Sequence, residues 1–186
     1  MNKIILASAS PRRKELLTKI TPDFDIIPSD AEEVYPDTLN SMDVSLYLSN
    51  LKAKDIHSKY PDKIVIGSDT TVIIDNQLLG KPKDKTDAKR MLSSLSNNYH
   101  FVVSGVTIYN KEEIHQINSI SKVFFKDLSE KDIDEYLEND EYKDKAGSYA
   151  IQGIASKFID HIEGDYDTIV GFPTSKVKEV LDKILN

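Results

Sequence analysis

The sequence contains no cysteine and only four histidines, His57, His100, His115 and His161. Without cysteine the chain can form no disulfide, no thiol nucleophile and no Cys-based zinc site. No two of the histidines have the HxxxH or HExxH spacing of a metal-binding helix. We therefore do not expect a metal site built from histidine.

Acidic residues outnumber basic ones, and long apolar runs are scarce. The 24 lysines and arginines are outnumbered by 31 aspartates and glutamates, which gives a net charge of −7 and a pI of about 5.1. This balance gives no electrostatic support for nucleic-acid binding. The apolar run that follows Lys3 is four residues long, too short for a signal peptide or a membrane span. We expect a cytoplasmic protein that binds neither nucleic acid nor membrane.

Glycine-based signatures of common nucleotide and hydrolase folds are missing as well. The chain has no GxxxxGK[ST], which excludes a P-loop NTPase, and no GxGxxG, which would indicate a dinucleotide fold. It also has no GxSxG nucleophile elbow. Any phosphate chemistry must therefore use another scaffold.

The residues that are present predict a mixed α/β protein. The 186 residues, 39% hydrophobic and 30% charged, fit one globular domain over residues 1–186. Apolar runs typical of strands, such as residues 3–7 and 24–28, alternate with helical spacing, as in residues 43–60. Period-two alternation over residues 100–125 predicts a long antiparallel pair that turns near residues 110–112. These patterns favour a mixed sheet flanked by helices.

The first fourteen residues predict a strand, a polar loop and a helix start. Ser10 has the N-cap position and Pro11 the first helical position, where its missing N–H costs nothing. Arg12 and Arg13 follow in the first turn, where cations oppose the helix dipole. An anion bound among the free N–H groups would explain them. A solvated arginine pair in an ordinary loop is the alternative.

A second candidate lies after the apolar run 64–67, which predicts a strand that ends at Gly67-Ser68-Asp69-Thr70. Ligands of α/β sheets bind outside the carboxyl ends of strands, so Asp69 is well placed to bind a metal or to act as a general base. The alternative is that Asp69 caps a turn.

A third candidate is a set of charges, Glu32 and Glu33 with Lys52, Lys81 and Lys83. Carboxylates that hold Mg²⁺ and cations that hold phosphates are what phosphoryl chemistry requires. Taken one at a time, each of these charges is typical of solvated surface. The set indicates phosphoryl chemistry only if the segments converge.

Six motifs along the chain resemble, in order, those of the Maf family of nucleotide pyrophosphatases. They are Ser8-Ala9-Ser10-Pro11-Arg12-Arg13, Leu51-Lys52-Ala53, Ser68-Asp69-Thr70 with Gly80-Lys81-Pro82, His100–Val106, Asp144–Gly153 and Gly164–Pro173. The departures are Asn97 for a glycine, Ser104 for a threonine and Phe172 for a leucine, all at positions that look structural.

The resemblance implies an elongated α/β fold of the inosine-triphosphatase-like type, with two lobes around a central cleft. It implies hydrolysis of a nucleoside triphosphate between the α and β phosphates, which gives the monophosphate and pyrophosphate. It also implies a divalent cation, Mg²⁺ or Mn²⁺, and a homodimer.

The resemblance further assigns roles to individual residues. Asp69 would activate water and share the metal with Glu33, with Glu32 as the alternative carboxylate. Ser8, Arg13, Lys52 and Lys81 would contact the phosphates. The residues at positions that set base preference are Arg12, Thr70 and Gln152, a combination that resembles the subfamily acting on dTTP and UTP rather than on 7-methyl-GTP. The donors and acceptor of Gln152 suit the imide edge of uracil or thymine.

Two alternatives remain at this point. The same chemistry could be directed mainly at modified pyrimidine nucleotides, as a house-cleaning activity. The chain could instead be a nucleotide-binding regulator of cell division and septum formation, with which the family was first associated. A pure sensor would have no need of a carboxylate at Asp69, whereas hydrolysis does.

Overall fold

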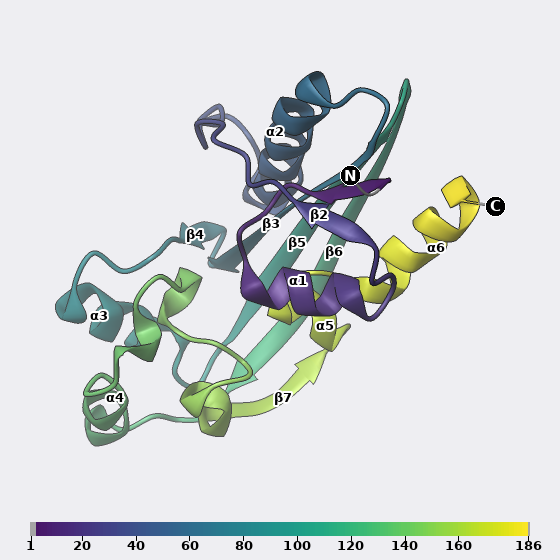
Figure 1. Ribbon diagram of the computed structural model, residues 1–186. Helices are drawn as coiled ribbons and strands as arrows, with labels where there is room; N and C mark the ends of the chain where they lie inside the picture. The colour runs from purple at the N-terminus through teal and green to yellow at the C-terminus, as the bar shows by residue number, and fades with distance from the viewer. Residues whose placement is uncertain (1–2, 186) are drawn as a thin grey trace. The chain divides into compact units, whose positions relative to one another are not determined.

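The structure, a computed structural model, describes residues 3–185 (Figure 1). The strands are β1 (Ile4–Leu6), β2 (Phe24–Ile26), β3 (Ile64–Ile74), β4 (Gln77–Leu79), β5 (Tyr99–Asn110), β6 (Glu113–Phe125) and β7 (Ile159–Glu163). The α-helices are α1 (Pro11–Thr18), α2 (Val44–Lys59), α3 (Lys85–Leu95), α4 (Glu130–Tyr136), α5 (Tyr166–Val170) and α6 (Thr174–Leu185). Short 3-10 helices are η1 (Ser41–Asp43), η2 (Asp140–Tyr142), η3 (Ala146–Ser148) and η4 (Ile154–Phe158).

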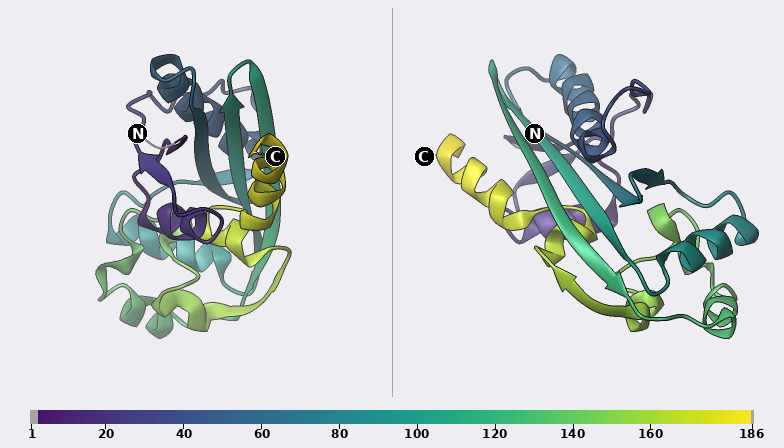
Figure 2. Two further views of the ribbon diagram at one scale, coloured as in Figure 1. Left: turned by 45° about the vertical axis from the view of Figure 1, so that its right-hand side comes forward. Right: turned by 180° about the vertical axis from the view of Figure 1, so that it is seen from behind.

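The strands form one mixed sheet. Its order is β2-β1-β3-β5-β6-β7, and β4 pairs with β3. β1 runs parallel to both β2 and β3, whereas β4 is antiparallel to β3 and β7 is antiparallel to β6. β5 and β6 are neighbours joined through residues 111–112, and Figure 2 shows this long hairpin from two further directions. The predicted mixed sheet and its hairpin are therefore confirmed.

The chain divides into two compact units. The first takes in the chain up to Thr70, Val103–Ser119 and the chain from Gly171 onward. The second takes in Thr71–Val102 and Ile120–Val170. No helix among residues 3–185 is long and apolar enough to cross a membrane.

In the first unit α2 lies directly on the backbone of the sheet. A Cβ at Gly67 of β3 would stand 2.3 Å from the Ser49 carbonyl oxygen, and a Cβ at Gly105 of β5 would stand 2.3 Å from the Leu46 nitrogen. Real Cβ atoms do not come this close to backbone, so both positions require glycine. Ala53 on this face of α2 is fully buried. Its neighbour Lys52 is thereby held close to the part of β3 that follows Gly67.

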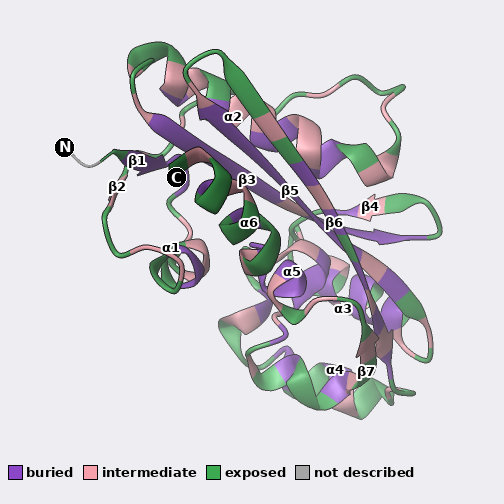
Figure 3. Ribbon diagram, turned by 90° about the vertical axis from the view of Figure 1, so that its right-hand side faces the viewer, coloured by how far each residue is buried: buried purple, intermediate pink, exposed green. Residues whose placement is uncertain are grey.

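The prediction that the first part of β3 ends at Gly67 is wrong. β3 continues without interruption to Ile74, and most of it is buried (Figure 3). Ser68, Asp69 and Thr70 can be strand residues because the sheet has a neighbouring strand, β5, for their backbone groups. The reading of Asp69 as a turn cap is therefore excluded.

A different strand, β1, ends next to Ser68 and Asp69. β1 pairs in parallel with β3 as far as Leu6 opposite Ile66, and the Ala7 amide donates to the Ile66 carbonyl at 2.8 Å. Beyond that point the chain leaves the sheet as the Ser8–Ser10 loop. The carboxyl end of β1 thus opens next to Ser68 and Asp69.

The predicted start of α1 is confirmed. Ser10 is the N-cap, its Oγ accepts from the Arg13 amide at 3.5 Å, and Pro11 is the first helical residue. Leu16 and Leu17 are the buried residues of this helix. They fix the face that α1 turns to the core, so the first turn, with Arg12 and Arg13, stays at the end of β1.

Candidate active site

Three charged side chains from different elements of the first unit meet at the Lys52 ammonium. Lys52 Nζ on α2 lies 2.7 Å from Asp69 Oδ1 on β3 and 2.9 Å from Glu33 Oε1 in the loop that follows β2. The Asp69 side chain is 11% exposed, that of Lys52 14% and that of Glu33 57%. Glu33 is the member of the Glu32–Glu33 pair whose carboxylate reaches this lysine.

Burial raises the pKa of Asp69, while Lys52 and Arg13 act in the opposite direction. A carboxylate is a better general base when its pKa moves toward the working pH. The two cations keep the charged form accessible despite the dry surroundings. Asp69 therefore has the surroundings that a proton acceptor requires.

The Asp69 and Glu33 pair fits a magnesium-type cation. Both carboxylates approach the same point in space, the Lys52 ammonium. Among residues 3–185 no group of three or more histidine, aspartate or glutamate side chains is arranged to hold a metal. Mg²⁺ is usually bound through one or two carboxylates, with substrate phosphates supplying further oxygens. Two converging carboxylates are enough for the protein's share of such a site.

A second group of side chains is built around the Arg13 guanidinium. Its Nη1 donates to Ser8 Oγ at 3.2 Å, its Nη2 to Thr70 Oγ1 at 3.1 Å and its Nε to the Gly171 carbonyl at 3.1 Å. Arg13 thus ties together the end of β1, the middle of β3 and the segment that precedes α6. These contacts fix the guanidinium in one orientation.

Gly171 has a backbone that favours glycine. Its φ is +120°, and a Cβ there would lie 3.1 Å from Thr70 Oγ1. Its carbonyl accepts from Arg13 and also from Ser68 Oγ at 3.2 Å. The glycine brings this carbonyl close to β3, where it orients Arg13.

Arg13 and Ser8 have hydrogen-bond donors left over for an anionic ligand. The bonds to Ser8, Thr70 and Gly171 use three of the five N–H groups of the Arg13 guanidinium. Ser8 Oγ accepts from both Arg13 and the Ser10 amide, at 3.3 Å for the latter, so its own proton is left to donate. Ser8 and Arg13 can therefore both donate to a phosphate while they keep these bonds.

The residues predicted to set base preference are placed as follows. Arg12 is half-buried in the first turn of α1. The Thr70 hydroxyl shares a hydrogen bond of 2.9 Å with Ser104 Oγ as well as its contact with Arg13. Thr70 therefore lies in the same network as Ser8 and Arg13, two residues predicted to bind phosphate.

Lys81 and Gln152 belong to the second unit, where both are exposed. The Gly147 amide donates to the Gly80 carbonyl at 3.1 Å. This bond joins the backbone next to Lys81 to the segment that leads to Gln152. Within the second unit the structure thus ties together the two segments that carry these predicted residues.

Ser68, Ser104 and the Gly171 carbonyl were not predicted as parts of the site. Ser68 and Ser104 are fully buried, and their hydroxyls bond to Gly171 and Thr70 respectively. A serine in an apolar strand is a weak signal of such a role. A backbone carbonyl gives no signal in the sequence at all.

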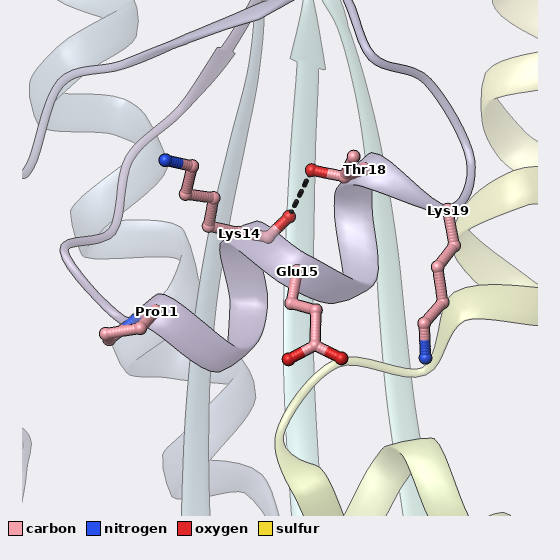
Figure 4. Close-up of a pocket in the computed structure, with 5 residues that line it drawn as sticks. All are labelled: Pro11, Lys14, Glu15, Thr18 and Lys19. Atoms are coloured by element: carbon pink, nitrogen blue, oxygen red, sulfur yellow. Dashed lines mark hydrogen bonds between the residues drawn. The ribbon is translucent and has the colours of Figure 1, made fainter.

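A hollow of about 400 Å³ lies elsewhere on the first unit, along the outer face of α1. Its lining residues are Pro11, Lys14, Glu15, Thr18 and Lys19 (Figure 4). None of these side chains belongs to the Asp69 or Arg13 groups. The hollow is therefore not the candidate active site.

Comparison with known proteins shows the family to which the chain belongs. The family model described as "Maf-like protein" matches residues 3–184. A dTTP/UTP pyrophosphatase of Clostridioides difficile is 42% identical over 182 residues, 97% of this chain and 94% of that protein. One of Bacillus anthracis is 44% identical over 177 residues, 95% and 93% of the two chains.

A solved structure shows the same fold at low sequence identity. The HAM1 protein from Coxiella burnetii aligns with a TM-score of 0.54 at 11% identity and covers 100% of this chain and 98% of its own. This likeness confirms the predicted α/β fold class. Because the family model spans nearly the whole chain and the relatives are at least 40% identical over nearly their full length, the chain belongs to the Maf family.

Proposed function

We propose that this protein is a nucleoside triphosphate pyrophosphatase that hydrolyses dTTP and UTP to the monophosphate and pyrophosphate. The proposal is supported by relatives of 40 to 44% identity that carry this activity in their names. The observation that carries it is the buried Asp69 carboxylate in contact with Lys52, within the same unit as the Arg13 network. This arrangement provides a base and anion-binding groups together.

Asp69 would take the proton of the attacking water. The water oxygen forms a bond to the α-phosphorus, the bond to the bridging oxygen breaks, and pyrophosphate leaves with its electrons. The raised pKa of Asp69 suits this step because the carboxylate must hold the proton it receives. Glu33 and Asp69 would hold Mg²⁺ or Mn²⁺, which supplies charge neutralisation for the leaving group when bound.

The phosphates would be held by Ser8, Arg13, Lys52 and Lys81. Arg13 is already oriented by Ser8, Thr70 and Gly171, so little further ordering is needed when a phosphate binds. Lys52 would exchange a carboxylate contact for a phosphate oxygen as the nucleotide arrives. Such preorganised donors are the main source of rate enhancement in phosphoryl chemistry.

Selection of a pyrimidine would depend on Arg12, Thr70 and Gln152. The Gln152 amide can pair with the donor and acceptor edge of uracil or thymine, and a guanidinium can donate to a base carbonyl. Modified pyrimidine triphosphates present much of the same edge. We therefore include them among the proposed substrates.

A panel of triphosphates tests the proposal. The purified protein with Mg²⁺ or Mn²⁺ should release pyrophosphate from dTTP and UTP faster than from dGTP or dATP. Methylated and pseudouridine triphosphates in the same panel would separate house-cleaning from turnover of ordinary nucleotides. Binding without turnover of any member would instead favour the regulator of cell division.

The homodimer is proposed on the family resemblance, whereas the cytoplasmic location stays a prediction from the sequence. Light scattering during gel filtration measures the oligomer directly. A monomeric mass at micromolar concentration would remove the dimer from the proposal and leave the reaction unaffected.

A further inference from the structure

The segment that carries Gln152, residues 144–154, is strongly bent and tied down at several points. We call it the Gln152 loop. Asp144 and Ser148 have φ values of +59° and +67°, which are uncommon for residues other than glycine. The Tyr136 hydroxyl donates to the Ser148 carbonyl at 3.0 Å in the interior of the second unit. A conformation of this kind persists only where surrounding contacts impose it.

Gln152 itself lies in a tight turn of this loop. The Gly153 amide donates to the Ala150 carbonyl at 3.1 Å, which closes a four-residue turn with Gln152 at its third position. Ile151 before it is buried, whereas Gln152 is exposed. The side chain is therefore presented to solvent from a backbone that is fixed on its N-terminal side.

On its C-terminal side the turn is held by Glu141. Glu141 Oε2 accepts from the Ile154 amide at 2.7 Å. The other oxygen, Oε1, is buried and has no hydrogen-bond partner among the residues that the structure describes. Glu141 is therefore held to the turn by one carboxylate oxygen, while the other oxygen fills the space beside Gly153.

The backbone of Gly153 makes room for this carboxylate. A Cβ at Gly153 would lie 1.5 Å from Glu141 Oε1 and 2.4 Å from its Cδ, and the nearest heavy atoms to that point all belong to Glu141. The φ of Gly153 is −104°, which any residue can adopt. A side chain at this position would therefore have to displace the Glu141 carboxylate.

We propose that Glu141 is a positioning residue for base selection, which fixes the Gln152 turn through the Ile154 amide and the space at Gly153. Its carboxylate does not itself touch the base. The inference rests on the proposed function in assigning Gln152 to the base. It adds that selectivity depends on a second residue, which acts through the backbone of the Gln152 turn.

The first test removes the carboxylate. Glu141→Ala should reduce the preference for dTTP over dGTP, measured both as kcat/KM and as Kd, by roughly tenfold, the effect of losing a charged hydrogen bond. Glu141→Gln should keep most of the preference, because its amide oxygen can still accept from Ile154. The matched control is Asp140→Ala, since that side chain is 81% exposed and pairs with Lys143. An unchanged preference in Glu141→Ala would overturn the proposal.

The second test is a double-mutant cycle at Gly153. Gly153→Ala in the wild-type background should lower selectivity as Glu141→Ala does, because the new methyl group displaces the carboxylate. In the Glu141→Ala background the same substitution should cost little, because the space is then empty. Additive effects of the two changes would contradict the direct contact on which the proposal depends.

A third test, hydrogen exchange at the Ile154 amide, does not depend on hydrolysis of a nucleotide. Hydrogen exchange at the Ile154 amide should become faster in Glu141→Ala and stay slow in Asp140→Ala. If the wild type hydrolysed no triphosphate, the proposed function would fail, but the exchange and the Kd ratio would still decide the role of Glu141. Unchanged exchange at Ile154 would overturn that role even in an active enzyme.

Discussion

Lys52 Nζ lies 2.7 Å from Asp69 Oδ1, and both side chains are almost entirely buried. The contact joins α2 to β3, and it exists because Gly67 allows α2 to approach the strand backbone. The second contact of Lys52, with Glu33, is on the solvent side, where Glu33 is 57% exposed. The buried contact therefore dominates the energetics, since exposed pairs contribute little.

Replacing Lys52 with methionine should destabilise the protein. The substitution keeps the length of the side chain but leaves Asp69 as a buried acid without its nearest counter-ion, which typically costs about 3 kcal/mol or more. The pKa of Asp69 should rise further, because Lys52 is the largest of the influences that lower it. Urea unfolding measures the loss.

The pH dependence of the stability lost in Lys52→Met identifies the cause of that loss. A protonated Asp69 needs no counter-ion, so the deficit of Lys52→Met should be larger at pH 8 than at pH 5. Lys54→Met is the control, because Lys54 is exposed on the same helix. An equal deficit at both values of pH would mean that lost packing, not lost charge pairing, explains the effect.

Asp69→Asn should reduce turnover by roughly a hundredfold to ten-thousandfold, which is the usual contribution of a general base. Asparagine preserves the shape and can accept from Lys52, so nucleotide binding should change much less than kcat. Pyrophosphate release and calorimetric titration with dTTP separate the two quantities. Equal loss of binding and turnover would indicate that Asp69 acts mainly through a metal or through structure.

Much of the local structure around the candidate site could be predicted because it depends on residues that are close in the sequence. Ser10 and Pro11 mark the start of α1, so the position of Arg13 at the end of β1 followed from helix-start chemistry. The helix start alone did not decide whether Arg13 binds an anion or is solvated. The phosphate-binding role came from the resemblance of the six motifs to the Maf family. The hairpin of β5 and β6 followed from its period-two pattern.

Other features depend on contacts between distant segments and could not be predicted. Polar residues Ser68 and Asp69 indicated a strand end, but the neighbouring β5 lets β3 continue through them. The sequence predicts a strand end at Gly67, whereas Gly67 is the point where α2 meets the sheet. The carboxylate of Glu141 gave no sign of its approach to Gly153, because the contact depends on how residues 144–154 fold.

Gly171→Ala should destabilise the protein by about 1 to 3 kcal/mol. The φ of +120° is unfavourable for alanine, and the new methyl group would be 3.1 Å from Thr70 Oγ1. The shift would also disturb the carbonyl that orients Arg13. Gly80→Ala is the matched control, because a Cβ there meets nothing within 4 Å, and its stability should change by less than about 0.5 kcal/mol. Similar melting temperatures for the two variants would contradict the strain at Gly171.

His100 should make the protein less stable in acid. The residue is fully buried in the second unit, its Nε2 is 2.6 Å from the Tyr149 hydroxyl, and burial lowers its pKa to about 3. In the unfolded chain the pKa is near 6.5. Between these values the unfolded state binds a proton that the folded state does not, so stability is present above about pH 6.5 and falls as pH decreases toward 3. The slope is at most about 1.4 kcal/mol per pH unit from this residue.

His100→Gln isolates the effect, because glutamine can still reach a hydroxyl but does not titrate. The variant can be less stable at pH 7, yet its free energy of unfolding should fall less steeply between pH 6 and pH 4 than that of the wild type. The difference in slope should approach one proton, and the carboxylates that also titrate in this range cancel in the comparison. His161→Gln serves as control, since His161 is exposed. Parallel curves for the wild type and His100→Gln would contradict the prediction, because they would show that His100 can be protonated in the folded protein. The buried Nδ1 of His100 has no hydrogen-bond partner among residues 3–185, so protonation would require a new acceptor there.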